Sequence, residues 1–321
     1  MIRDILYFSY IIKKEKYTDM KNLKGSILLL IAAFIWGTAF VAQTSGSKFV
    51  PAFTFNAVRS FVGAIFLWLV HYLSDTQRKR RIPEYVPGKW PVKGGIICGL
   101  VISFAMGSQQ LGIGMYPDGV AASGRAGFLT ATYVVMVAVY SQIYGRKIHP
   151  LIVTSVVGVI CGMYMLCMSG GFGAVYIGDV FLIICAICYT AHILVIDRFS
   201  SCDSIKLSCI QFVTCGIVSS VAALISDEII IDNIINAAGS ILFTGIMSSG
   251  VAFTLQMVGQ KYAEPAVASI VMSLESVFSV IAGWLVLGEM LTHKEMLGCV
   301  LVFVSVILAQ VPQFRKKAAV S

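Results

Sequence analysis

Charged residues are scarce in this chain: Asp, Glu, Lys and Arg make up 12% of its 321 residues, whereas apolar residues make up 58%. Soluble globular domains carry about a quarter charged residues. The composition therefore excludes an ordinary soluble protein and predicts one that crosses a membrane many times. The net charge of +8 lies in short clusters between apolar runs, so we expect a lipid bilayer and no nucleic acid as partner.

Catalytic signatures are also missing. The sequence has no phosphate-binding loop, no dinucleotide fingerprint, no HExxH motif and no nucleophile elbow. We therefore expect no cofactor, no metal and no enzymatic activity, and a pump driven by ATP would need a partner chain. The nine cysteines do not change this, because eight lie inside apolar runs and the CxxC of Cys185 and Cys188 has no second pair nearby. We interpret them as buried thiols.

Apolar runs long enough to cross a bilayer are plentiful. A helix of about 20 residues spans the hydrocarbon core. The sequence predicts an all-α integral membrane protein with ten helical spans, at residues 25–43, 53–73, 94–114, 119–140, 151–169, 177–196, 205–225, 237–258, 265–287 and 295–311. The basic, proline-bearing segment 74–93 is predicted to be a solvated loop.

The distribution of positive charge supports this count. With the N-terminus in the cytoplasm, 20 of the 24 Lys and Arg residues lie on the cytoplasmic side. Lys48 and Lys294 lie on the opposite side, while Arg59 and Arg125 lie within spans. Such a bias sets membrane orientation, so we predict that both termini are cytoplasmic.

A weak internal repeat divides the chain into two halves of five spans. Trp36 and Tyr189 occupy equivalent positions in spans 1 and 6, and Gln110 and Gln256 in spans 3 and 8. Because five is odd, the second half must insert upside down relative to the first. Inverted repeats of this kind are typical of secondary transporters, which bind their substrate near the midplane between the halves.

Several segments resemble the EamA family of the drug/metabolite transporter superfamily. They are IWGTAFVAQTSG, PAFTFNAVRSFVGAIFL, AASGRAGFLTATYVV, SSGVAFTLQMVGQ and SLESVFSVIAGWLVLGE. The resemblance implies repeats at 24–169 and 175–311, and a cavity lined mainly by spans 1, 3, 4, 6, 8 and 9. It also implies export of a small metabolite, without specifying which. One departure is that span 4 ends in Gly145-Arg146-Lys147 where span 9 ends in Gly288-Glu289.

The two ends of the chain lie outside these repeats. Residues 312–321 form a basic cytoplasmic tail, and residues 1–23 precede the first span. Met20 begins a compact start just before that span. Residues 1–19 are therefore either a translation-start artefact or a disordered tail, and the intact mass of natively expressed protein decides between them.

Glu275 is the strongest candidate for intramembrane chemistry. It is the only formal charge between Val267 and Leu287, and Thr132 takes the equivalent place in the first half. A carboxylate at this depth costs several kcal/mol unless it faces protein or water. It is either a proton-coupling or cation-binding group in the cavity, or a structural carboxyl paired or kept neutral within the bundle.

Arg59 and Arg125 lie inside spans and cannot lose their charge. One of them could pair with Glu275 and leave the other for a substrate carboxylate. The resemblance favours Arg125 as the cavity residue and Arg59 as a structural charge, because span 2 is expected at the periphery.

The remaining candidates for the cavity are polar and aromatic residues within spans. Each has an alternative role: helix-to-helix contact for the glutamines, packing for the aromatic rings, and an interior hydrogen bond for the histidine. They are Trp36, Gln109, Gln110, Tyr133, His192 and Gln256.

The function predicted from the sequence is secondary active transport of a small organic solute, such as an amino acid or a drug-like molecule, by alternating access. The plasma membrane is the expected location, while proton coupling, with Glu275 as its candidate residue, and a homodimer are both left open. Two rivals are a membrane enzyme acting on lipid-borne substrates and a sensor or scaffold with a transporter fold. Solute flux in proteoliposomes separates a transporter from both.

Overall fold

Helices make up the regular structure of the protein wherever the computed structural model describes it, at residues 2–82, 84, 86–117, 120, 122–143, 150–167, 176–287 and 293–318. Within these helices the side chains of residues 2–22, 142, 163, 166, 167, 287, 295, 299, 306 and 309–318 are not described. The helices are α1 Ile2–Gly46, α2 Ala52–Arg81, α3 Val92–Gly114, α4 Ala122–Ala131, α5 Tyr133–Ile143, α6 Pro150–Cys167, α7 Ile177–Arg198, α8 Ser204–Ser226, α9 Ile231–Asn236, α10 Ala238–Phe243, η1 Thr244–Ala252 (a π-helix), α11 Phe253–Gly259, α12 Pro265–Met272, α13 Glu275–Leu287 and α14 His293–Ala318.

Within the described residues, eight helical stretches are long and apolar enough to cross a membrane. Three of them join consecutive elements: α4 with α5, α10 with η1 and α11, and α12 with α13. The eight are Leu23–Gly46, Ala52–Arg81, Val92–Gly114, Ala122–Ser141, Ile177–Arg198, Ser204–Ser226, Ala238–Gly259 and Pro265–Val286. They correspond to predicted spans 1–4 and 6–9. The regions of spans 5 and 10 hold shorter apolar helices, Pro150–Gly162 and Met296–Ser305.

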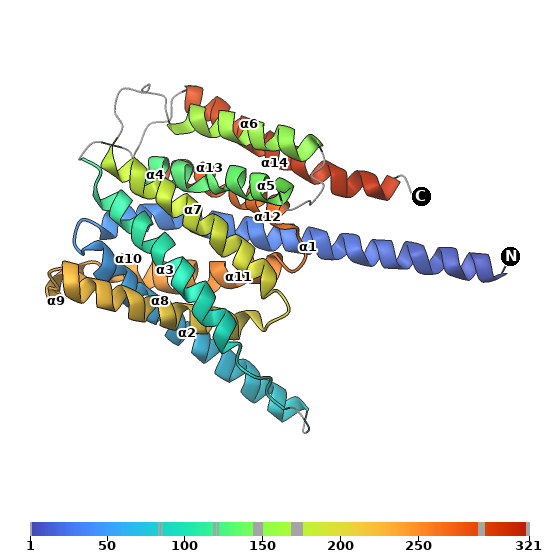
Figure 1. Cartoon of the computed structure of the whole chain (residues 1–321), viewed down its shortest axis with the longest axis horizontal. Helices are drawn as coiled ribbons and strands as arrows, with labels where there is room; N and C mark the ends of the chain where they lie inside the picture. Colours follow the sequence, from blue (N-terminus) through green and yellow to red (C-terminus); the bar gives the residue numbers. More distant parts are fainter. Residues whose placement is uncertain are drawn as a thin grey trace.

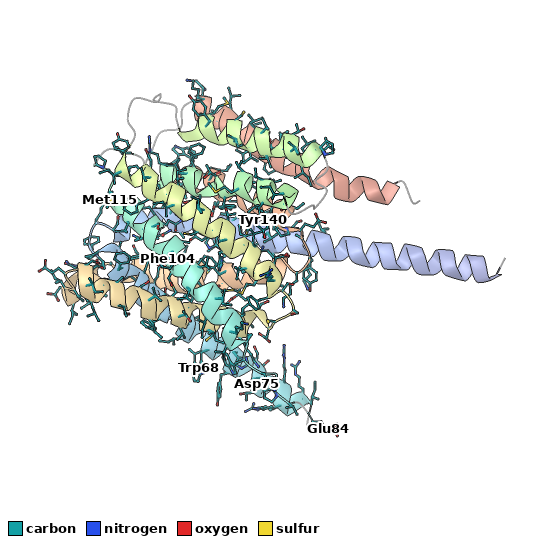
Figure 2. The ribbon with its side chains drawn as sticks, viewed as in Figure 1. Trp68, Asp75, Glu84, Phe104, Met115 and Tyr140 are labelled. Atoms are coloured by element: carbon teal, nitrogen blue, oxygen red, sulfur yellow. The ribbon has the colours of Figure 1, made fainter. Side chains whose placement is uncertain are left out.

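The surface of the bundle is apolar. Trp68 on α2 is 51% exposed and Phe104 on α3 is 65% exposed, and both lie on the outside of the bundle (Figure 2). Exposed apolar side chains on this scale are unfavourable in water and suit contact with lipid tails. The charged residues Asp75 and Glu84 lie farther along α2 and beyond its end (Figure 2).

Helix α1 runs through the middle of the bundle (Figure 1). It contacts α10, η1 and α11 on one side and α4, α12 and α13 on another. On the outside, α2 packs along α8, α3 packs along α7 and α8, and α6 packs along α14. This arrangement places the middle of α1 beside the elements that surround the central cavity.

Two close approaches between helices depend on glycine. A Cβ on Gly37 of α1 would overlap Phe278 and lie 2.9 Å from the backbone oxygen of Glu275, so the missing side chain lets α1 lie directly against α13. A Cβ on Gly245 of η1 would lie 2.9 Å from the backbone oxygen of Arg59 on α2. Small residues allow such backbone contacts within membranes.

Two helices extend past the predicted spans. The segment 74–93 was predicted to be a loop, but α2 continues to Arg81 before the chain leaves the helix. Basic residues in the last turn favour this end of a helix electrostatically, and Lys79 forms an ion pair of 3.1 Å with Asp75 one turn earlier. Helix α1 begins at Ile2 and includes the segment predicted to be an artefact or a disordered tail (Figure 1).

Asp227, at the end of α8, caps the beginning of α2. Its Oδ2 accepts hydrogen bonds from the backbone N of Thr54 at 2.7 Å and from Thr54 Oγ1 at 2.9 Å. The first N–H groups of a helix lack partners within it, and a carboxylate there also interacts favourably with the helix dipole. This contact ties the start of α2 to α8.

We expect Asp227→Ala to lower the stability of the protein by about 1 kcal/mol, the usual effect of losing a helix cap. The measurement is the thermal unfolding midpoint of the purified protein in detergent. Glu228→Ala removes an exposed neighbouring carboxylate and is the matched control. Equal shifts in the two variants would show that Asp227 acts only through its charge at the surface.

Candidate functional site

A cavity lies at the centre of the bundle. Its lining comes from α1, α3, α4, α5, α7, η1, α11, α12 and α13, which belong to the predicted spans 1, 3, 4, 6, 8 and 9, and from one residue of α2. The lining residues are Trp36, Phe40, Gln43, Arg59, Gln109, Thr130, Tyr133, Tyr189, Ile193, Ser248, Phe253, Gln256, Met272 and Glu275.

Two of the contributing spans are interrupted beside the cavity. The span of α4 and α5 breaks at Thr132, and the span of α12 and α13 breaks at Ser273 and Leu274. Around each break the backbone bonds tighten to the i→i+3 pattern, as in Thr132 N to Leu129 O and Leu274 N to Val271 O, both 3.3 Å. Short irregular turns inside helices often mark functional hinges.

The first residues after the two breaks face the cavity. Tyr133 begins α5 and Glu275 begins α13, and both are buried lining residues. They lie close enough to interact electrostatically. The Tyr133 hydroxyl and Glu275 Oε1 nevertheless have no hydrogen-bond partner within the described part of the chain.

The third irregular element is η1, whose π-helical turn is followed directly by α11. It contributes Ser248, and α11 contributes Phe253 and Gln256. A π-helix carries one extra residue per turn, so the side chains after it point in a direction that a regular helix would not give. Such turns are frequent at functional sites.

Five polar atoms around the cavity are buried without a partner. Among the residues that the structure describes, Trp36 Nε1 and Arg59 Nε are donors without acceptors, and Gln256 Oε1 and Glu275 Oε1 are acceptors without donors. The Tyr133 hydroxyl can do either. Buried polar atoms are nearly always hydrogen-bonded in folded proteins, so a cluster of open ones around one cavity indicates a binding site for a polar ligand.

Other polar groups of the lining satisfy one another. Tyr189 Oη donates to Gln109 Oε1 at 3.5 Å, and Gln109 Nε2 donates to Thr130 Oγ1 at 3.3 Å. This chain of bonds joins α7, α3 and α4. These hydrogen bonds stabilise the wall of the cavity. The donors and acceptors that have no partner are the ones that can bind a ligand.

Aromatic rings form the apolar part of the wall. The rings of Trp36 and Phe253 meet edge to face with centroids 4.8 Å apart, and Tyr189 stacks against Phe253 at 6.5 Å. Such contacts fix ring orientations. The cavity therefore combines a rigid apolar wall with a few open polar groups, which is the usual composition of a small-molecule site.

Five of the predicted candidates line the cavity: Trp36, Gln109, Tyr133, Gln256 and Glu275. Gln110 and His192 are fully buried but are not among the lining residues. Gln110 Nε2 donates to the backbone oxygen of Gln43 at 3.3 Å. His192 Nε2 lies 2.9 Å from Gln211 Oε1, and its ring packs edge-on against Phe253. Both residues therefore support the cavity from behind its wall.

The two arginines occupy the opposite places from those predicted. Arg59 was predicted to be structural, but it lines the cavity. Its Nη1 donates to Gln43 Oε1 at 2.9 Å, and only 1% of the residue is exposed. Arg125 was predicted to face the cavity, but it is not among the lining residues and pairs with Asp179. The physical reason is that α2 approaches η1 closely enough for Arg59 to reach inward.

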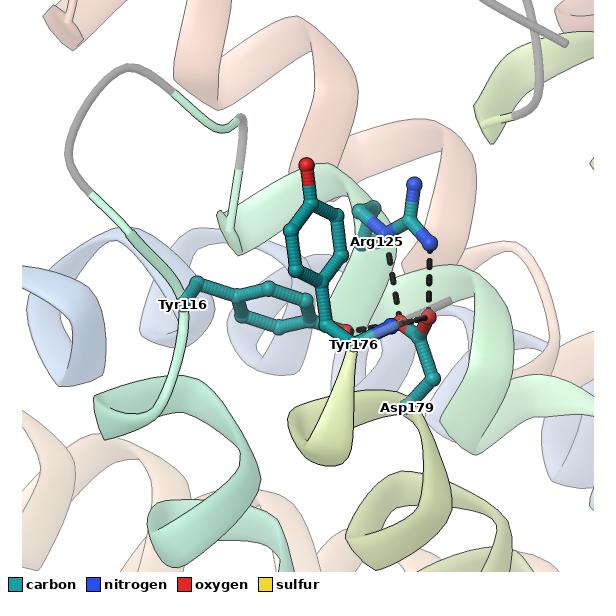
Figure 3. A network of polar contacts seen from close by, with 4 residues as sticks. All are labelled: Tyr116, Arg125, Tyr176 and Asp179. Carbon is teal, nitrogen blue, oxygen red and sulfur yellow. Dashed lines mark hydrogen bonds and ion pairs between the residues drawn. The ribbon is translucent and has the colours of Figure 1, made fainter. Parts of the chain in front are cut away.

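Arg125 belongs to a network with Asp179, Tyr116 and Tyr176, which we call the Arg125–Asp179 network (Figure 3). Its Nη2 lies 2.7 Å from Asp179 Oδ2 and its Nε 3.2 Å from Oδ1. The guanidinium lies 5.0 Å from the centre of the Tyr176 ring, within range of a cation–π contact. The network joins α4 to α7, and therefore predicted span 4 to predicted span 6.

Asp179 also accepts hydrogen bonds from two other donors of this network. Tyr116 Oη donates to Oδ1 at 2.5 Å, and the backbone N of Tyr176 donates to Oδ2 at 2.9 Å (Figure 3). Burial, together with the adjacent carboxylate, raises the pKa of the Tyr116 phenol above its ordinary value, so the phenol remains a donor. Thr130, a cavity residue, follows Arg125 on α4 by about one and a half turns. The network therefore joins α4 to α7 near one end of the cavity.

Sequence reasoning missed Asp179 and several of the lining residues. Asp179 lies in the first turn of α7, and nothing in the sequence analysis singled it out. Tyr189 was noted only as the repeat partner of Trp36, although both rings line the cavity. Gln43 and Phe253 carried no signal of their own. The motifs Gly145-Arg146-Lys147 and Gly288-Glu289 lie outside the described residues.

No three His, Cys, Asp or Glu side chains of the described residues lie together as ligands for a metal ion.

The comparisons with known proteins point to transport. A model of the EamA-like transporter family matches residues 23–168 and 176–310. An "Uncharacterized transporter" of Archaeoglobus fulgidus is 27% identical over 305 residues, which cover 94% of this chain and 91% of that protein.

A second relative is the "Uncharacterized transporter YoaV" of Bacillus subtilis. It is 23% identical over 292 residues, which cover 87% of this chain and 94% of that protein. One solved crystal structure of a protein superimposes with a TM-score of 0.72 at 18% identity and covers 91% of this chain and 98% of that one. At this level of identity the likeness concerns the fold alone.

Proposed function

The chain belongs to the EamA-like transporter family and is a membrane transporter, and from this premise we propose that it is a secondary active transporter of a small organic solute. The observation that carries the proposal is the central cavity, where two interrupted spans meet and five polar atoms have no hydrogen-bond partner among the described residues. Interrupted helices beside a central site are the recurring design of such transporters.

In this proposal ten spans form two inverted halves. The eight long helical stretches are spans 1–4 and 6–9, and the shorter helices Pro150–Gly162 and Met296–Ser305 are spans 5 and 10. The excess of Lys and Arg between alternate spans supports this arrangement with both termini in the cytoplasm. The plasma membrane stays the expected location. The direction of transport is export by family resemblance, and a homodimer stays an expectation.

Alternating access requires that the cavity open to one side of the membrane at a time. With the proposed topology, the Arg125–Asp179 network lies at the outer end of spans 4 and 6, one from each half. We propose that it closes the outer side. The breaks at Thr132 and at Ser273 and Leu274 are then the hinges about which the outer parts of spans 4 and 9 move.

Glu275 is the proposed coupling residue. It lines the cavity, begins α13 and has an oxygen without a partner in the described part of the chain. A buried carboxyl can bind or release a proton as its surroundings change from dry protein to an open, wet cavity. Proton binding and solute binding at one cavity are thereby linked.

Solute flux through proteoliposomes tests the proposed function. Vesicles containing the purified protein are loaded with a mixture of small metabolites, and efflux is measured by mass spectrometry with and without a proton gradient. We expect gradient-dependent efflux of at least one solute, compared with vesicles that contain no protein. A protein that binds solutes but moves none under either condition would be a sensor or scaffold.

A further inference from the structure

Arg59 is a permanent positive charge buried at the cavity without a counter-ion. It is 1% exposed, and its guanidinium stays protonated at any physiological pH. Among the described residues Arg59 forms no ion pair with a carboxylate, whereas Lys79 pairs with Asp75 and Arg125 pairs with Asp179. A buried charge that is left uncompensated is unfavourable by several kcal/mol.

The surroundings of Arg59 present its charge to the cavity. Gln43 binds Nη1 through its side-chain oxygen, and Gln110 holds the backbone of Gln43. The ring of Phe55 lies 5.8 Å from the guanidinium carbon. Nε has no hydrogen-bond partner among the described residues. Neutral groups therefore orient the guanidinium without neutralising it.

We propose that the cavity binds organic monoanions, whose carboxylate pairs with Arg59 and whose apolar body packs against the aromatic wall. When Glu275 is protonated, Arg59 is the one charged side chain among the lining residues, so it matches one negative charge on the solute. A guanidinium suits a carboxylate because both are planar and can form paired hydrogen bonds. Trp36 and Phe253 provide the apolar surface. This inference rests on the proposed function, because it assigns a substrate class to the same cavity.

The first test compares acids with their neutral amides on the wild-type protein. The probes are acetate, benzoate and phenylacetate, each matched with acetamide, benzamide or phenylacetamide, and the measurement is the thermal unfolding midpoint in detergent. A ligand that binds only the folded protein raises this midpoint. We expect at least one acid to raise it while its amide does not. If no acid stabilises the protein more than its amide, the proposal is wrong.

The second test removes the charge. Arg59→Gln should weaken binding of the acid about 10- to 100-fold, the loss of one charge-assisted pair, and leave binding of the amide unchanged. Arg59→Lys keeps the charge without the fork of hydrogen bonds and should give an intermediate loss. Arg198→Gln removes an exposed charge at the end of α7 and is the matched control. An acid that binds Arg59→Gln as tightly as wild type contradicts the assignment.

Flux separates this inference from the proposed function. If the protein binds acids through Arg59 but moves none of them in proteoliposomes, the proposed transport is contradicted and the anion site at Arg59 is supported. A protein that transports amides as fast as acids would disprove the anion site and retain transport.

Discussion

Glu275→Gln is expected to abolish solute accumulation driven by a proton gradient while the protein keeps its fold. Glutamine has nearly the same shape as glutamic acid and can form hydrogen bonds, but it cannot release a proton. A gradient of one pH unit supplies about 1.4 kcal/mol per proton, enough for about tenfold accumulation when one proton moves with each solute. The variant should show no accumulation, measured as the ratio of solute across the vesicle membrane at steady state.

Glu264→Gln is the matched control for this experiment. Glu264 directly precedes α12 and predicted span 9, and it is exposed rather than buried at the cavity. The control should accumulate solute like wild type. If Glu275→Gln also accumulates solute with the same dependence on the gradient, the coupling residue lies elsewhere and Glu275 has a structural role.

The sequence was sufficient to predict where the membrane helices lie, because hydropathy and charge bias depend on local composition. Eight of the ten predicted spans correspond to helices that are long and apolar enough to cross a membrane. The continuation of α2 to Arg81 was missed for a physical reason. Hydropathy marks where a helix leaves the membrane, whereas helix propensity and terminal charges decide where the helix ends.

The direction in which a side chain faces was harder to predict. Position in the sequence gives the depth of a residue in its span, and this placed Glu275 near the middle of span 9. A helix that is apolar on all sides gives no signal for the face that meets its neighbours. Arg125 was therefore assigned to the cavity, and Arg59 to a structural role, by family resemblance. In the structure α2 packs closely against Gly245 of η1, and Arg59 rather than Arg125 lines the cavity.

Breaks inside spans were likewise invisible in the composition. The sequence around Thr132 and around Ser273 contains no proline, and its apolar pattern continues through both positions. The hydroxyl groups offer a partial explanation, because Thr132 Oγ1 bonds Leu129 O and Ser273 Oγ bonds Ile270 O. Such bonds compete with the backbone pattern and bend helices. The internal repeat aligns Thr132 with Glu275, so the two breaks lie at nearly equivalent positions in the two halves.

Breaking the Arg125–Asp179 pair should produce the largest loss of stability. The two side chains are only 14% and 11% exposed, so removal of one charge leaves the other in a poorly solvated place. We expect Asp179→Asn to lower the free energy of unfolding by about 3–5 kcal/mol. The double variant Arg125→Gln with Asp179→Asn removes both charges and should be more stable than Asp179→Asn alone. Unfolding midpoints of the wild type, both single variants and the double variant give the coupling between the two residues.

The same variants test whether the pair closes the outer side. A cysteine placed at Thr130, which lines the cavity, should react faster with a charged maleimide added from outside when Asp179→Asn is present. Mass spectrometry of the labelled peptide distinguishes this thiol from the native cysteines. Asp203→Asn, which alters a helix cap at the end of α8 nearest α7, should leave the labelling rate unchanged. A stability loss without faster labelling would show that the pair braces α4 against α7 but does not control access to the cavity.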